Sequence, residues 1–273
     1  MSAFRQSCKA VVFGAAVLLS GTAVAAPPSR VMSLNICTDQ LLLALAPERR
    51  IASLTFLARE QVPLRYWPQG ARIPVNYGSA EEILATRPDL VLTGPFLAPL
   101  TRKVLKQSGI PVVEVPLAES FDQIRAVTRQ VAQALHTEAR GEVLIAHMDE
   151  DLRVLARQKP ARPFRTAQWG NGGYVPGNKG VFGAMLGAIG ATSIGDGSSF
   201  FDIEALIAGK PEALIYSDTY AGLATLRDDQ DEHPALKARL PRLSYSSFYE
   251  CGVPQLAASA RKLQDGLLKA VRR

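Results

Sequence analysis

Two glutamates, Glu81 and Glu204, lie at equivalent positions of a segment that occurs twice in the chain. Residues 80–92 (AEEILATRPDLVL) align without a gap with residues 203–215 (IEALIAGKPEALI), 123 positions later. Each glutamate falls in the first turn of a predicted helix. A carboxylate there can stabilise the helix by about 0.3–1 kcal/mol through the helix dipole. It can also form charge-assisted hydrogen bonds with a basic group of a partner.

Each copy predicts the same local structure, which is a capped short helix, a proline that ends it and a buried strand. Ser79 and Asp202 precede the two copies, and both are good N-caps. In the first copy Glu82 stands where it can close a capping box with Ser79, so Glu81 is not needed for that box. Two copies at similar places in the two halves of the chain predict two similar lobes.

The first 25 residues have the composition of a secretory signal peptide. Arg5 and Lys9 precede an apolar run from Ala10 to Leu19. Ala23-Val24-Ala25 forms a small-residue cleavage site. The run of about ten apolar residues is too short to span a bilayer. No cysteine stands at the cleavage site, so a lipid anchor there is not expected. Residues 26–273 are therefore expected to be exported to the periplasm.

The charge of the exported part is mild. Removing Arg5 and Lys9 from the formal net charge of +6 leaves +4. The basic residues are scattered and form no stripe with interleaved aromatic residues, so nucleic-acid binding is not expected. We expect a monomer.

Strand and helix patterns alternate through the exported part, which predicts an α/β fold with parallel sheets. The longest uninterrupted helical pattern covers residues 137–159 and would be about 34 Å long at 1.5 Å per residue. It lies in mid-chain, between an N-terminal lobe over 26–136 and a C-terminal lobe over 160–273. Since no low-complexity linker separates the halves, we expect this long helix to join the lobes rigidly.

This order of elements resembles the substrate-binding proteins of ABC importers for iron–siderophore complexes, haem and cobalamin. The resemblance covers nearly all of the exported chain. It rests on the strand Arg30-Val-Met-Ser-Leu34, the pattern Glu-x-Ile-Leu-Ala-x-x-Pro-Asp-Leu-Val at 81–91, the long helix and Glu204. It implies two α/β lobes bridged by a helix, one ligand held between them, no catalytic step and no cofactor besides the transported ligand. It also implies that Glu81 and Glu204 dock against arginines of a permease dimer in the inner membrane.

The ligand site is expected on loops at the carboxyl ends of the strands, where open α/β sheets bind their ligands. Several of these loops carry aromatic residues, which suit a large, flat or amphipathic ligand. Core packing is the alternative role for any one of them, and Trp169 and Tyr174 are favoured as contacts because they lie among glycines. The candidate ligand-binding residues are Asn35, Thr38, Phe56, Tyr77 and Phe96 in the first lobe, and Trp169, Tyr174, Tyr220, Phe248 and Tyr249 in the second.

The expected ligand is a metal chelate, with a ferric siderophore first and haem or cobalamin as alternatives. The mild positive charge favours an anionic chelate, while Tyr77 or Tyr174 could supply an axial ligand to haem iron. In the cobalamin carriers that the chain resembles, an aromatic residue directly follows the strand that here ends at Thr93. This chain has Gly94-Pro95 there, which argues against a cobalamin-like contact. A metal site of the protein's own is not expected, because the three histidines fall on predicted helices or a polar surface loop. They are His136, His147 and His233.

The resemblance places Cys37 and Cys251 near the gap between the lobes. Because both would be exported to an oxidising compartment, we expect a disulfide between them. Two buried thiols, or a thiolate pair that contacts a metal-bearing ligand, are the alternatives. The alternative function is a secreted α/β hydrolase built on Cys37, although no nucleophile elbow of the Gly-x-Ser-x-Gly type supports it.

Overall fold

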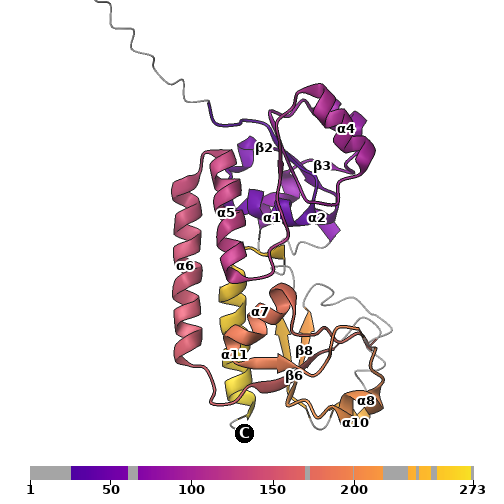
Figure 1. Ribbon diagram of the computed structural model, residues 1–273, viewed down its shortest axis with the longest axis vertical. Helices are drawn as coiled ribbons and strands as arrows, with labels where there is room; N and C mark the ends of the chain where they lie inside the picture. The colour runs from indigo at the N-terminus through magenta and orange to yellow at the C-terminus, as the bar shows by residue number, and fades with distance from the viewer. Residues whose placement is uncertain are drawn as a thin grey trace, which may run out of the picture.

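The computed structural model describes the backbone of most of the chain after residue 25 (Figure 1). The described residues are 26–60, 67–169, 173–198, 200–217, 233–237, 240–246 and 251–271. The proposed signal peptide, residues 1–25, therefore lies outside them, as do the candidate contacts Tyr220, Phe248 and Tyr249.

The N-terminal lobe contains a five-stranded parallel sheet in the order β3-β2-β1-β4-β5. Its strands are β1 (Val31–Ser33), β2 (Ile51–Thr55), β3 (Val75–Asn76), β4 (Leu90–Thr93) and β5 (Val112–Glu114). Its helices are α1 (Ile36–Leu45), α2 (Leu57–Glu60), α3 (Ala80–Thr86), α4 (Pro99–Ser108) and α5 (Phe121–Leu135), with short 3-10 turns at Glu48–Arg50 and Pro68–Arg72.

The C-terminal lobe contains a second parallel sheet, four-stranded, in the order β7-β6-β8-β9. Its strands are β6 (Phe164–Gln168), β7 (Ala191–Ser193), β8 (Ala213–Ser217) and β9 (Arg242–Tyr245). Its described helices are α7 (Gly180–Ile189), α8 (Ile203–Ala208), α10 (Pro234–Lys237) and α11 (Leu256–Val271). The predicted fold class, two similar α/β lobes with parallel sheets joined by one long helix, is confirmed.

The long helix α6 (Glu138–Arg157) runs beside both lobes, with α5 packed along one half of it and α11 along the other (Figure 1). It lies within the predicted range 137–159. Ion pairs tie its first half to α5, where Arg129 binds Glu142 at 2.7 and 3.0 Å, and its second half to α11, where Arg261 binds Asp151 at 2.8 Å. One hydrophobic core continues from the first sheet through α6 into the second lobe. No helix among the described residues is both long and apolar enough to cross a membrane.

The duplicated segments form the same local structure in the two lobes. Ser79 and Glu82 close the capping box of α3, and Asp202 caps α8 by accepting from the Ala205 N–H at 2.7 Å. Along residues 80–88 and 203–211 each residue is buried, half-buried or exposed like its counterpart in the other lobe, at all nine aligned positions. The repeat seen in sequence is therefore also a repeat of backbone and packing.

A second pair of contacts extends this duplication beyond the thirteen aligned residues. The Arg30 side chain donates to the Thr86 carbonyl oxygen at 2.7 Å, and Arg165 donates in the same way to the Gly209 carbonyl oxygen at 2.6 Å. Thr86 and Gly209 are themselves 123 positions apart. Each arginine thus ties the end of the repeated helix to the first strand region of its own lobe.

The first helix of the N-terminal lobe begins shortly after β1. Thr38 is of a residue type that favours N-caps, but α1 begins at Ile36 and its N-cap is Asn35, whose side chain accepts from the Cys37 N–H at 2.8 Å. The Thr38 hydroxyl instead interacts with Ser33 Oγ at 2.7 Å and donates to the Asn35 carbonyl at 2.9 Å.

Candidate functional site

The carboxyl ends of the two sheets face one another, and a disulfide joins them. Cys37 follows the end of β1, and Cys251 follows the end of β9; their Cα atoms are 4.9 Å apart and their sulfurs are bonded. This is the pairing that the sequence favoured over two free thiols or a thiolate pair. Next to it, a Cβ on Gly252 would lie 2.6 Å from the Ala118 Cβ, so the chain returns to the first lobe in close contact before α11 begins.

The first lobe presents three of the predicted aromatic residues at the carboxyl ends of its strands. Phe56 follows β2 and Tyr77 follows β3, and their rings stack with centroids 5.0 Å apart and planes inclined by 19°. Tyr77 is 73% exposed, and Phe96, which follows β4, is 80% exposed. Because β2 and β3 are neighbours in the sheet, their two aromatic residues meet. The stacked pair, with Tyr77 exposed, gives an apolar surface that a flat ligand could cover.

In the second lobe Tyr174 packs against an aromatic residue that the sequence analysis missed. The rings of Tyr174 and Phe200 lie 5.8 Å apart, and the two residues form an isolated antiparallel bridge. Phe200 is 71% exposed, whereas Tyr174 is half-buried and donates its hydroxyl to the Gly197 carbonyl at 3.2 Å. Phe200 was missed because the three-residue strand β7 was not predicted. The run Gly195–Phe201, rich in Gly and Ser and ending in two phenylalanines, was the available signal.

Two predicted ligand contacts are wrong, because the structure buries them. Trp169 is only 2% exposed and packs with Val175, Leu206 and Leu214 in a separate small core of the second lobe. Leu206 and Leu214, which pack with it, are distant from it in the sequence. Thr38 is also buried, with its hydroxyl bonded inside the first lobe.

Asn35 has a structural role, and its position near the site is also compatible with contact to a ligand. Its side-chain oxygen Oδ1 caps α1. Its side-chain nitrogen Nδ2 lies against Gly94, where an added Cβ would come within 3.0 Å of it. Asn35 is therefore fixed between the carboxyl ends of β1 and β4. Gly94 is small for the same reason, since a larger residue there would displace the cap.

A buried polar network lies beneath the aromatic residues of the first lobe and was not predicted from sequence. The Asp39 carboxylate accepts from the Thr55 N–H at 3.1 Å and from the Thr55 hydroxyl at 2.5 Å. Burial raises the pKa of Asp39 to about 7, although the hydrogen bonds from neighbouring hydroxyls and from the Thr55 N–H act to lower it. Asn76 donates to the Ser53 hydroxyl at 2.8 Å and to the Leu54 carbonyl at 2.7 Å. These bonds hold the ends of β2 and β3, and with them the loops that carry Phe56 and Tyr77.

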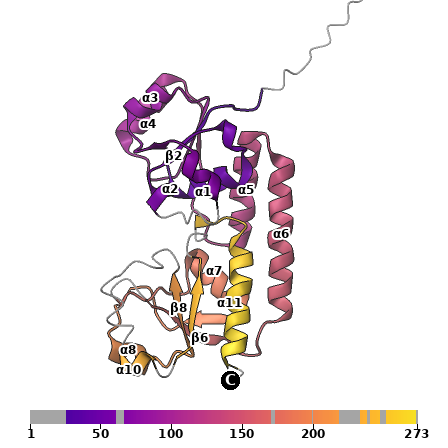
Figure 2. The same cartoon turned by 180° about the vertical axis from the view of Figure 1, so that it is seen from behind.

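The two repeated glutamates lie on a different part of the surface. Glu81 and Glu204 are exposed, and neither carboxylate has a hydrogen-bond partner among the described residues. Figure 2 shows α3 and α8 near opposite ends of the molecule, both on the side away from α6. A single broad partner could therefore contact both helices at once.

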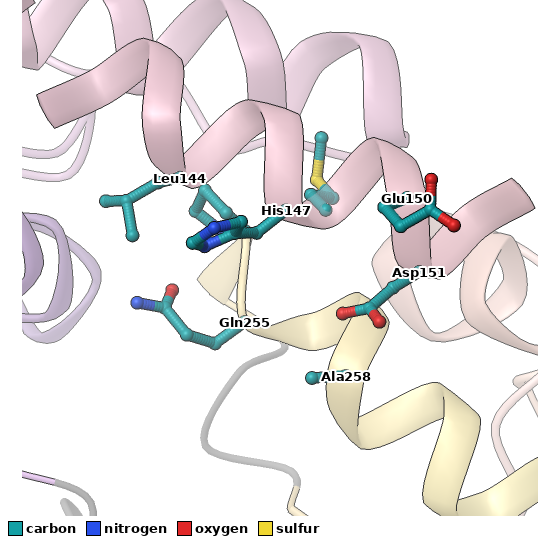
Figure 3. Close-up of a pocket in the computed structure, with 8 residues that line it drawn as sticks. Leu144, His147, Glu150, Asp151, Gln255 and Ala258 are labelled. Carbon is teal, nitrogen blue, oxygen red and sulfur yellow. The ribbon is translucent and has the colours of Figure 1, made fainter. Parts of the chain in front are cut away.

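A cavity of about 390 Å³ lies apart from both of these surfaces, between α6 and the start of α11 (Figure 3). His147 and Asp151 reach it from α6 and Gln255 from the other side, but Asp151 is already paired with Arg261. None of the predicted ligand contacts lines it. The lining residues are Leu144, His147, Met148, Glu150, Asp151, Pro254, Gln255 and Ala258.

Of the three histidines, all within the described part of the chain, His136 ends α5, His147 lies on α6 and His233 precedes α10, and each is exposed. Among the described residues, no three His, Cys, Asp or Glu side chains are grouped so that they could hold a metal ion.

Comparisons with known proteins agree with this architecture. The sequence profile of a family described as periplasmic binding protein matches residues 33–238. No curated protein matches the chain in a sequence search. Among solved structures, the periplasmic haem-binding protein BhuT in complex with two haems is similar with a TM-score of 0.71 and 24% identity, covering 89% of this chain and 98% of that one.

Two further solved structures show the same fold. The periplasmic haem-binding protein RhuT from Roseiflexus sp. RS-1 has a TM-score of 0.72 and 22% identity, with 89% of this chain and 98% of that one covered. The periplasmic vitamin B12-binding protein BtuF of Vibrio cholerae has a TM-score of 0.69 and 16% identity, with 90% and 99% covered. Since the family profile covers most of the sequence and the two-lobed architecture is the same, this chain belongs to the periplasmic binding proteins.

Proposed function

We propose that this protein is the periplasmic substrate-binding component of an ABC importer and that it holds one metal chelate between the facing carboxyl ends of its two sheets. The observation that carries the proposal is the set of aromatic rings at those ends, above all the exposed Tyr77 stacked on the half-buried Phe56. The signal-like residues 1–25 support export to the periplasm. The ligand would be transported cargo, so the protein needs no cofactor for this role.

Among the three chelates, the geometry favours haem, in place of the ferric siderophore that was expected first. Flat exposed rings are suited to the flat face of a tetrapyrrole. Haem iron also needs an axial ligand, for which a tyrosine phenolate is one of the known choices. Tyr77 fits this role better than Tyr174, because it is largely exposed whereas the Tyr174 hydroxyl is already bonded to Gly197. Several similar structures are described as haem-binding proteins, which agrees with this choice.

Titration with haemin, cyanocobalamin and a ferric hydroxamate tests the ligand, with absorbance and tryptophan fluorescence as readouts. We expect haemin to saturate and Tyr77→Phe to weaken its binding by about tenfold or more and to change the absorbance spectrum of the bound iron. Tyr174→Phe is the matched control and should keep the spectrum. Saturation by cyanocobalamin or the hydroxamate but not by haemin would change the ligand, and no saturable response to any of the three would contradict chelate binding.

The second part of the proposal concerns the membrane partner, which Glu81 and Glu204 would contact. We propose that these exposed, unpaired carboxylates form charge-assisted pairs with arginines of a permease dimer in the inner membrane. Glu81→Ala combined with Glu204→Ala should abolish haemin uptake while ligand affinity and melting temperature stay nearly unchanged. Glu82→Ala is the control, because Glu82 closes the capping box with Ser79 and should cost stability but not uptake. Uptake at the wild-type rate by the double variant would show that the glutamates are not docking residues.

The competing hypothesis, a secreted hydrolase, has lost its proposed nucleophile, since the Cys37 sulfur is bonded to Cys251. The family to which the chain belongs also consists of binding proteins. Recovery of intact haemin after prolonged incubation with the protein is the expected result, and release of a degraded product would favour an enzyme.

A further inference from the structure

Each of the repeated helices exposes a large apolar side chain one turn after its glutamate. Leu84 is 46% exposed on α3 and Ile207 is 41% exposed on α8, and the two positions are 123 residues apart, like Glu81 and Glu204. Residues three apart in a helix are neighbours on its surface. In both lobes, therefore, an unpaired carboxylate and a large exposed aliphatic side chain lie side by side.

The remaining exposed residue of each helix is also apolar. On α3 it is Ala85 and on α8 it is Ala208. The inner face of each helix is buried against its lobe, since Ile83 and Leu206 are both 0% exposed. The outer face of each helix thus consists of one acidic residue and two apolar ones. A helix face that meets only water is normally covered by polar and charged side chains.

A single exposed leucine on a protein surface needs no explanation. The two side chains here are different, because they occur at the same position of two lobes, in the same burial class, beside the same acidic residue. Aliphatic side chains at both positions, a leucine in one copy and an isoleucine in the other, preserve apolar contact area of similar size. Matched faces on two lobes fit a partner that presents the same complementary surface twice.

We propose that Leu84 and Ile207, with Ala85 and Ala208 beside them, are apolar anchors by which the two lobes dock on the two subunits of a symmetric permease dimer. The inference rests on the proposed docking role of Glu81 and Glu204 and adds the contacts next to them. On each permease subunit the complementary surface is an apolar depression beside a basic side chain. The carboxylate contributes charge complementarity and orientation, and burial of the aliphatic side chain contributes binding free energy that does not depend strongly on salt.

The experiment compares haemin uptake by cells that lack the natural copy of this chain and produce variants at graded periplasmic concentrations, with cyanocobalamin and the ferric hydroxamate as further transported probes. Leu84→Gln combined with Ile207→Gln keeps good helix-forming residues at both positions. We expect this variant to need at least about tenfold more protein for half-maximal uptake. Its maximal uptake, melting temperature and haemin affinity should equal those of the wild type.

Two controls make the result specific. Val143→Gln replaces an exposed apolar residue of α6, on the side away from α3 and α8, and should leave uptake unchanged. Leu84→Met combined with Ile207→Leu preserves apolar contact and should also keep wild-type uptake. Wild-type concentration dependence of the glutamine variant would overturn the inference, and so would a fall in its melting temperature of more than a few degrees, which would make the two residues structural.

The glutamate variants separate this inference from the proposed function. If Glu81→Ala with Glu204→Ala abolishes uptake while the glutamine variant behaves as wild type, the proposed docking stands and the apolar anchors are rejected. If the alanine variant transports normally, the proposed docking role of the glutamates fails and the inference falls with it. If the wild type transports none of the three probes, the proposed function itself fails.

Discussion

Arg87 and Lys210 share an uncommon backbone conformation at equivalent positions of the two lobes. Their φ angles are 49° and 47°, in the left-handed region that non-glycine residues rarely occupy. Each follows its repeated helix and precedes the proline that leads to the next strand. The same turn is therefore used twice, with the nearby carbonyls held by Arg30 in one lobe and Arg165 in the other.

This shared conformation predicts that glycine is stabilising at both sites. Arg87→Gly and Lys210→Gly should each raise the free energy of unfolding by about 0.5–1 kcal/mol, because glycine has no Cβ to oppose positive φ. Denaturant unfolding measures the change. As a control, Arg153→Gly in the exposed part of α6 should lower the free energy by about 1 kcal/mol. Loss of stability at either turn would contradict the argument.

The disulfide between Cys37 and Cys251 predicts a large effect of its removal. The bond closes a loop across 214 positions of the chain, so it restricts the unfolded state strongly. Cys37→Ser combined with Cys251→Ser should lower the free energy of unfolding by about 2–5 kcal/mol. Thiol titration of the denatured, unreduced protein from the periplasm should find no free thiol. Two reactive thiols per chain would instead indicate that the cysteines remain unpaired.

Asp39 predicts a specific dependence of stability on pH. Burial raises its pKa from 3.8 to about 7, so the folded state holds the proton more tightly than the unfolded state does. This carboxyl therefore carries no penalty below about pH 4. Between about pH 4 and 7 it lowers the free energy of unfolding as the pH rises, by at most about 4 kcal/mol in total.

The measurement for Asp39 is denaturant unfolding of the wild type and of Asp39→Asn at pH 4, 6 and 8. The asparagine variant should gain stability relative to the wild type between the first and last of these values, since it has no proton to lose. Its amide oxygen can still accept from the Thr55 N–H. Parallel pH profiles for the two proteins would show that Asp39 is not responsible for the slope.

The continuous helix α6 predicts that the lobes move little relative to each other on ligand binding. It packs against α5 and α11 and shares one core with both lobes, so it lacks the few loop residues that absorb large dihedral changes in a hinge. Small-angle scattering profiles with and without haemin should nearly superimpose. A clear decrease in the radius of gyration would reveal a hinge that this packing does not explain.

Features that depend on neighbouring residues could be predicted without the fold. Signals for the ends of a helix act within a few positions of the chain. They include the caps Ser79 and Asp202, the capping box with Glu82 and the proline after each helix. They could therefore be recognised twice, and the two lobes followed from them. The alternation of strands and helices and the uninterrupted pattern of α6 are local in the same way. Glu81 and Glu204 were found because the repeat aligned them.

Features that depend on contacts between distant segments could not be predicted and are seen only in the folded chain. Trp169 is followed by glycines in the sequence, yet Leu206 and Leu214 bury it. Asp39 lies on an apolar helix, and its role depends on Thr55 from the next strand. The short strands β3 and β7 are too brief to show a period, so Phe200 was missed. Local signals predict the longer elements and their order, whereas burial and pairing are set by residues that only folding brings together.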